Sequence, residues 1–146
     1  MKRSITNTNI MITGGAGFIG SHLADGLIKN SIGNLVVIDN LFLGTKQNLN
    51  FADKYKKFHF FNDDACDPNI LSYIIDKFKI ETVFNCATKP LNYSFINPKS
   101  AFDINTSITL NLLELQRKNK FNTLCHFSTS EVYGTSVNDV MNETHP

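Results

Sequence analysis

Short apolar runs alternate with longer amphipathic stretches along the chain. The apolar runs have the length and residue types of buried strands, which we expect at residues 9–13, 34–39, 58–61, 82–86 and 123–128. Apolar residues spaced three or four apart predict helices that run from the end of a glycine turn to residue 30, over residues 68–78 and over residues 98–119. A further short helix is expected within residues 46–55.

Strands that alternate with helices are typical of a parallel sheet covered on both faces. Because crossovers are right-handed, the order predicts the α/β class, as a doubly wound parallel sheet or Rossmann fold. Ligands of such sheets bind at the carboxyl ends of the strands. The expected walls of the site are therefore the segments that follow the strands, namely Gly14–Gly20, Asp39–Thr45, Asn62–Asp67, Cys86–Tyr93 and Ser128–Gly134.

The first strand leads into a glycine-rich turn and then into a helix. Gly14, Gly17 and Gly20 have the spacing that lets a chain turn sharply, lets a pyrophosphate approach the backbone and lets the helix pack on the sheet. Free N–H groups at the helix start, together with the helix dipole, favour phosphate. Asp39 follows at about the 20-residue distance where a carboxylate binds the adenosine ribose. The pattern predicts a dinucleotide site, and a glycine turn followed by a surface Asp is the alternative.

The composition is that of an ordinary folded domain. Hydrophobic residues make up 42% of the chain and charged residues 18%, and the net charge is +1. We therefore expect no nucleic-acid partner. The apolar runs are shorter than the ~20 residues that span a bilayer, so no membrane association is expected.

Three cysteines, Cys66, Cys86 and Cys125, form no C-x-x-C pair, and two of them fall in strands predicted to be buried. We expect reduced thiols and no metal site, as in a cytoplasmic protein. The basic start Met1–Arg3 is followed by an apolar stretch that polar residues interrupt, so a signal peptide is not expected.

The segment Ser128–Gly134 follows the last predicted strand and offers three hydroxyls and a carboxylate. A hydroxyl there can hydrogen-bond a reacting oxygen, and Glu131 can serve as a general base or can orient one. The alternative is a polar turn whose hydroxyls bond the backbone, which composition alone favours.

Several motifs, taken in order, resemble the extended short-chain dehydrogenase/reductase family, the NAD-dependent epimerases, dehydratases and decarboxylases of sugar nucleotides. The motifs are Thr13–His22, Asp39–Asn40 with Gly44, Asp64–Asp67, Asn105 and Ser128–Gly134. The resemblance implies NAD as the cofactor, and NADP is disfavoured because Asp39 would repel a 2′-phosphate. The cofactor-binding residues that it implies are Gly14, Gly17, Phe18, Ile19, Gly20, Asp39, Asn40, Asp64, Ala65, Ala87 and Asn105.

By the same resemblance, Thr129, Ser130 and Glu131 are the catalytic candidates. Thr129 matches the residue that hydrogen-bonds the sugar hydroxyl, which bound NAD oxidises transiently at C4. Ser130 stands where the dehydratases carry an acidic Asp, and the segment is similar to that of UDP-glucuronate decarboxylases. The resemblance thus implies decarboxylase-like or epimerase chemistry on a UDP- or dTDP-linked sugar, and a homodimer of the full-length form through residues 98–119.

The family's Tyr-x-x-x-Lys pair is not found in a suitable place. Its spacing occurs only at Tyr73 and Lys77, on a helix predicted to lie away from the site. We therefore expect residues 1–146 to be an incomplete NAD-binding domain, cut before the last strand and the substrate-binding part, that binds NAD weakly and turns over nothing. The alternative is a non-catalytic dinucleotide-binding module or an inactive fragment.

Overall fold

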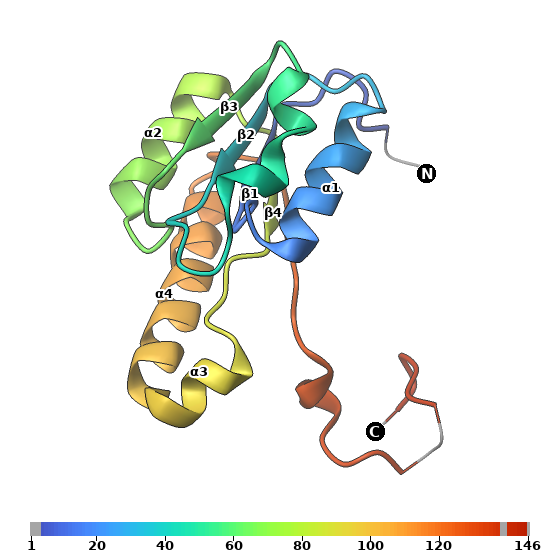
Figure 1. Ribbon diagram of the computed structural model, residues 1–146, viewed down its shortest axis with the longest axis vertical. Helices are drawn as coiled ribbons and strands as arrows, with labels where there is room; N and C mark the ends of the chain where they lie inside the picture. The colour runs from blue at the N-terminus through green and yellow to red at the C-terminus, as the bar shows by residue number, and fades with distance from the viewer. Residues whose placement is uncertain (1–3, 138–139, 146) are drawn as a thin grey trace.

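The structure is a computed structural model that describes residues 4–137 and 140–145, so Met1–Arg3 and Pro146 lie outside it. Within the described residues, five parallel strands form one sheet in the order β3-β2-β1-β4-β5 (Figure 1). The strands are β1 (Ile10–Thr13), β2 (Leu35–Ile38), β3 (Phe58–Phe61), β4 (Thr82–Asn85) and β5 (Thr123–His126).

The three long predicted helices are present. They are α1 (Phe18–Ile28), α2 (Pro68–Phe78) and α4 (Pro98–Arg117). The short helix expected within residues 46–55 is instead a pair of 3₁₀ turns, η1 (Lys46–Leu49) and η2 (Ala52–Lys54). Two elements were not predicted, the short helix α3 (Leu91–Ile96) and the 3₁₀ turn η3 (Ser130–Tyr133).

Helices cover both faces of the sheet, with α1 on one side and α2 and α4 on the other (Figure 1). Successive strand residues point to opposite faces. In β1, Met11 packs into the core with α2 and α4, whereas Ile10 and Ile12 pack with α1, η1 and η2. This arrangement confirms the predicted doubly wound parallel sheet.

All strands end at one level. Thr13 pairs with Ile38 on one side and with Asn85 on the other, and Asn85 pairs with His126, each the last residue of its strand. The strand order reverses between β1 and β4. The loops that follow the strands therefore meet at the carboxyl edge, around the switch point where ligands of such folds bind.

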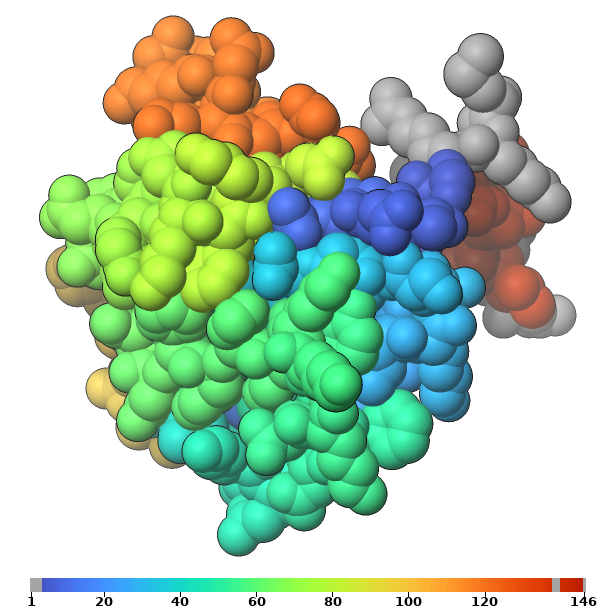
Figure 2. Space-filling view, turned by 90° about the horizontal axis from the view of Figure 1, so that it is seen from above, coloured from blue at the N-terminus to red at the C-terminus, as the bar shows by residue number. Residues whose placement is uncertain are grey.

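The amino edge of the sheet is closed by the N-terminal segment. Figure 2 shows this edge from above, with the blue N-terminal residues beside the yellow-green residues that precede β4. Asn9 joins the two neighbouring turns, because its side-chain oxygen accepts the Asn34 N–H at 2.7 Å and its carbonyl accepts the Glu81 N–H at 2.9 Å.

The cysteines are free thiols, but one expectation about them is wrong. Cys125 is exposed rather than buried, and Cys86 is only partly buried. The reason is the alternation along β5, because Leu124 packs against the core with α2 and α4, and Cys125 points to the opposite face, where it joins neither core cluster. Among the described residues, no helix is both long enough and apolar enough to cross a bilayer.

Candidate functional site

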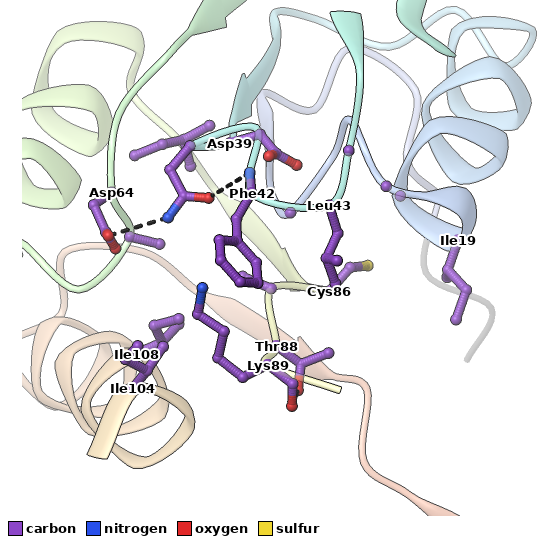
Figure 3. A pocket seen from close by; sticks show the side chains of 18 of the residues that line it. Ile19, Asp39, Phe42, Leu43, Asp64, Cys86, Thr88, Lys89, Ile104 and Ile108 are labelled. Atoms are coloured by element: carbon purple, nitrogen blue, oxygen red, sulfur yellow. Dashed lines mark hydrogen bonds between the residues drawn. The ribbon is translucent and has the colours of Figure 1, made fainter. Parts of the chain in front are cut away.

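A cavity of about 370 Å³ opens at the carboxyl edge, around the switch point between β1 and β4. Its walls come from the loops after β1, β2, β3 and β4 and from α4 (Figure 3). Of the predicted cofactor residues, those that line it are Gly14, Gly17, Phe18, Ile19, Gly20, Asp39, Asn40, Asp64, Ala65 and Ala87. The fold thus brings together residues that lie far apart in the sequence.

The amino end of α1 forms one end of the cavity. Gly17 is the N-cap and has no side chain with which to satisfy the first N–H groups, and the first turn carries no acidic residue. Phe18, Ile19 and Gly20 begin the helix and line the cavity. The orphan N–H groups and the positive end of the helix dipole suit an anionic group such as a phosphate.

Two glycines are required by the backbone at this place. Gly14 has a φ of +68°, and a Cβ there would lie 2.6 Å from the Ala87 nitrogen. A Cβ on Gly20 would lie 2.5 Å from the Gly14 carbonyl oxygen. The first glycine therefore allows the sharp turn after β1, and the last allows α1 to pack on that turn, as the spacing predicted.

Asp39 is nearly buried beside the turn. One carboxylate oxygen accepts the Ala16 N–H at 2.9 Å, and the other accepts the Leu41 N–H at 2.8 Å. The side chain thus ties the glycine turn to the loop after β2. Each carboxylate oxygen keeps a second acceptor position for a ligand hydroxyl.

Asn40 and Asp64 form the opposite end of the cavity. The Asn40 amide donates to the Asp64 carboxylate at 3.1 Å and accepts the Phe42 N–H at 3.1 Å, as the dashed lines in Figure 3 show. Partial burial by itself would raise the pKa of Asp64. Bonds from the Cys66 backbone N–H and the Asn40 amide outweigh burial and hold the pKa below its usual value. Asp64 is therefore a carboxylate at neutral pH.

Lys89 is a cavity residue that the sequence analysis did not single out. Its ammonium lies 2.9 Å from the centre of the Phe42 ring and 5.1 Å from that of Tyr93 (Figure 3). Asn105 holds the Lys89 backbone, because its amide accepts the Lys89 N–H at 2.7 Å and donates to the Lys89 carbonyl at 3.0 Å. Asn105 thus supports the wall and does not line the cavity, although the resemblance implied a cofactor contact.

Apolar side chains complete the cavity, and the sequence analysis placed only those of the Asp39–Thr45 wall at the site. They are Phe42 and Leu43 from the loop after β2, and Ile104 and Ile108 from α4. The sequence predicted only that the two isoleucines are buried in the core, since they fall on the apolar face of α4. Lys89 lies within the predicted wall Cys86–Tyr93, although no role was assigned to it individually.

The structure does not bring the predicted catalytic segment to the cavity. Thr129, Ser130 and Glu131 are exposed, and in Figure 1 the chain after β5 runs away from the sheet. The Thr129 hydroxyl accepts the Glu131 N–H at 3.2 Å, so it acts as a local cap of η3. This bond matches the alternative of a polar turn, and the catalytic roles stay predictions.

The Tyr73 and Lys77 pair lies on α2, as expected. The Lys77 ammonium donates to the Tyr73 hydroxyl at 2.8 Å, and both residues lie outside the cavity lining. The spacing of this pair is a property of the exposed surface of α2, and we assign it no role in the site.

Known proteins match the chain over most of its length. UDP-glucuronic acid decarboxylase 3 of Arabidopsis thaliana is 36% identical over 130 residues, which are 88% of this chain and 35% of that protein. CDP-paratose 2-epimerase of Salmonella typhi is 36% identical over 140 residues, which are 92% of this chain and 40% of that protein. The chain therefore spans less than half the length of these curated relatives.

A solved structure agrees with the fold. UDP-glucose 4-epimerase of Thermus thermophilus, in complex with NAD, aligns with a TM-score of 0.80 and 29% identity, over 95% of this chain and 44% of that one. The sequence profile of the family described as GDP-mannose 4,6 dehydratase matches residues 11–146. The chain thus belongs to this family of the extended short-chain dehydrogenase/reductases, as its motifs indicated.

Proposed function

We propose that the chain forms the NAD-binding domain of an enzyme that modifies a nucleotide sugar. The observation that carries the proposal is the uncapped amino end of α1, which shares one cavity with the carboxylate of Asp39. A phosphate-binding helix end beside a ribose-binding acid is the arrangement that a dinucleotide requires. The cavity volume falls within the range of about 300–1,000 Å³ that is usual for ligand pockets.

Each end of the cavity receives a part of the cofactor in this proposal. The N–H groups of Phe18, Ile19 and Gly20 hold the pyrophosphate, and Asp39 accepts hydrogen bonds from the adenosine ribose. Asp64 and the Ala65 backbone lie at the adenine. Asp39 would repel a 2′-phosphate, so NAD is preferred over NADP. The complex of the Thermus thermophilus relative with NAD supports this choice.

When bound, NAD supplies hydride transfer at C4 of the sugar. The Thr129 hydroxyl orients the sugar hydroxyl, and Glu131 acts as a base or orients one. Ser130 lacks the acidity needed to expel hydroxide, which favours decarboxylation or epimerisation. The names of a UDP-glucuronic acid decarboxylase and a UDP-glucose 4-epimerase support the same choice, and they favour the UDP-linked sugar among the proposed UDP- or dTDP-linked substrates.

A second candidate is a dinucleotide-binding module without catalysis. The exposure of Thr129 and Glu131, away from the cavity, favours this candidate. Incubation with NAD and UDP-glucuronic acid or UDP-glucose separates the two. We expect no product from residues 1–146 by themselves. Carbon dioxide release or a 4-epimer, detected by NMR with the native protein, supports the enzyme, and neither product despite bound NAD supports the module.

The cofactor proposal is tested by titrating the chain with NAD and with NADP while amide shifts are recorded by NMR. We expect weak binding of NAD, shifts concentrated at Phe18, Ile19 and Gly20, and at least about tenfold weaker binding of NADP, the effect of one well-placed repulsive charge. Equal binding of both dinucleotides would contradict the role of Asp39. No binding of either would overturn the proposed function.

A further inference from the structure

Both backbone polar groups of Ala16, in the middle of the glycine turn, have hydrogen-bond partners. Its N–H donates to the Asp39 carboxylate at 2.9 Å. Its carbonyl oxygen accepts two donors from the segment after β2, the Thr45 N–H at 3.2 Å and the Asn48 side-chain amide at 2.8 Å. Ala16 itself is fully buried and does not line the cavity, so this carbonyl faces away from it.

The segment that carries these donors lies tightly on the turn. A Cβ on Gly44 would lie 2.6 Å from the Ala16 carbonyl carbon, so only glycine allows this approach. The 3₁₀ turn η1 follows at once and packs beside α1 (Figure 1). Asn48 belongs to η1, and Thr45 is the N-cap of η1. The segment therefore packs against the turn, with Gly44 in the cavity lining and Thr45 and Asn48 outside it.

We propose that Asn48 is a positioning residue for the pyrophosphate site, acting through the Ala16 carbonyl. The inference rests on the proposed function, since it concerns the same cofactor. A peptide group is planar, so the direction of the Ala16 carbonyl sets the direction of the next N–H. That N–H, on Gly17, donates to the Gly14 carbonyl at 3.2 Å and closes the turn from which α1 starts.

The physical reason is preorganisation. Donors aimed at a ligand bind most strongly when they need no rearrangement. With Asn48 in place, the Ala16 carbonyl has two donors and stays turned away from the phosphates. Without the Asn48 amide, the Ala16 carbonyl keeps only the Thr45 N–H as a donor. The peptide group can then rotate and turn the negative end of its dipole, the carbonyl oxygen, toward the phosphates. The loss concerns ligands that carry a pyrophosphate, because the Ala16 N–H that bonds Asp39 belongs to the preceding peptide group, which Asn48 does not contact.

The test compares Asn48→Ala with the unmodified chain by NMR titration of NAD, ADP and adenosine. We expect about fivefold weaker binding of NAD and ADP, the usual effect of one hydrogen bond, and unchanged binding of adenosine. Asn48→Gln, which retains the amide donor, recovers part of the affinity. Asn50→Ala removes an amide from the C-cap of the same 3₁₀ turn and serves as the matched control, with no change for any ligand.

Four results overturn the inference. Equal binding of NAD by Asn48→Ala and the unmodified chain shows that the Asn48 contact does not matter. If Asn48→Ala weakens the binding of NAD and of adenosine equally, the substitution loosens the whole domain rather than the position of the turn. A loss of dispersed amide signals in both Asn48 variants would show the same. If the unmodified chain binds no NAD, the proposed function fails first, and this inference fails with it.

Discussion

Asp39 illustrates how a single residue serves both the fold and the site. Its spacing from the glycine turn predicted a ribose-binding acid, and the structure places it in the cavity. Both carboxylate oxygens also accept backbone N–H groups, from Ala16 and Leu41. The acid therefore ties the glycine turn to the loop after β2, a role that its spacing did not indicate.

The first prediction concerns Asp39→Asn. In either orientation the new amide nitrogen faces one of the two backbone N–H groups, so one nearly buried donor loses its acceptor. We expect the free energy of unfolding to fall by about 1–3 kcal/mol. Urea denaturation followed by circular dichroism measures the change. Asp53→Asn, on the exposed side of η2, is the control and should leave stability unchanged. Equal stability of both variants would contradict the bonding of Asp39.

The second prediction concerns the thiols. Burial, and then the neighbouring Cys125, raise the pKa of Cys86 to about 11. Burial and the nearby Asp64 raise the pKa of Cys66 to about 11 as well. Because the thiolate is the nucleophile, both thiols should react slowly with iodoacetamide at pH 7.5. Their rates should rise about tenfold per pH unit until the pH reaches the thiol pKa of about 11. The exposed Cys125 should react first.

Mass spectrometry of the alkylated peptides measures the order in which the three cysteines are alkylated. NAD should slow the alkylation of Cys86, which lines the cavity, and should leave that of Cys125 unchanged. Alkylation of Cys86 at neutral pH as fast as that of Cys125 would show that Cys86 is not shielded as the structure describes.

At the scale of elements, local signals predicted the start of α2 correctly. Asp67 and Pro68 read as an N-cap followed by the first helical residue, and the Asp67 carboxylate accepts the Asn69 N–H at 2.8 Å. The short helix α3 was missed because it gives no periodic signal. It spans six residues, buries none of them and has no side-chain cap.

The third prediction is that Asp67→Ala lowers the free energy of unfolding by about 1 kcal/mol, the usual contribution of an N-cap. Asp67→Asn, which retains a capping oxygen, should recover most of the loss. Thermal unfolding by calorimetry gives both values. Equal destabilisation by the alanine and asparagine variants would indicate that the carboxylate acts through its charge rather than as a cap.

At the scale of the whole molecule, α3 and α4 leave a large apolar surface uncovered. Phe95 and Ile96 are 78% and 79% exposed, and Phe102 is 70% exposed. Leu110 and Leu113 lie further along α4, on the same side as Phe102 by helical spacing. Exposed apolar patches of this kind mark interaction sites. We propose that a second copy of the chain covers the patch, in line with the homodimer that the resemblance implies.

The fourth prediction follows from this surface. The chain should self-associate, and Phe102→Glu should shift it toward the monomer in sedimentation velocity at the same concentration, because a charge would be buried in the contact. Tyr73→Glu, on the half-exposed surface of α2, is the matched control and should leave association unchanged. A monomer throughout, or an equal effect of both variants, would contradict the role of α4.

The sequence by itself determined the sheet, its long helices and most of the cavity lining. These features rest on local rules, since apolar periodicity sets the elements and parallel strands bring their carboxyl ends to one edge. Gly14 and Asp39 could be assigned from the motif and its spacing, whereas Asp64 was implied by the resemblance to the family that the motif order indicated.

Only the tertiary structure decided which loop residues meet. Lys89 reaches Phe42, and Asn48 reaches Ala16, through contacts between segments that no periodicity relates. Burial was also decided at this level. Cys125 lies in an apolar strand but is exposed, because it points to the face of β5 opposite Leu124 and joins neither core cluster.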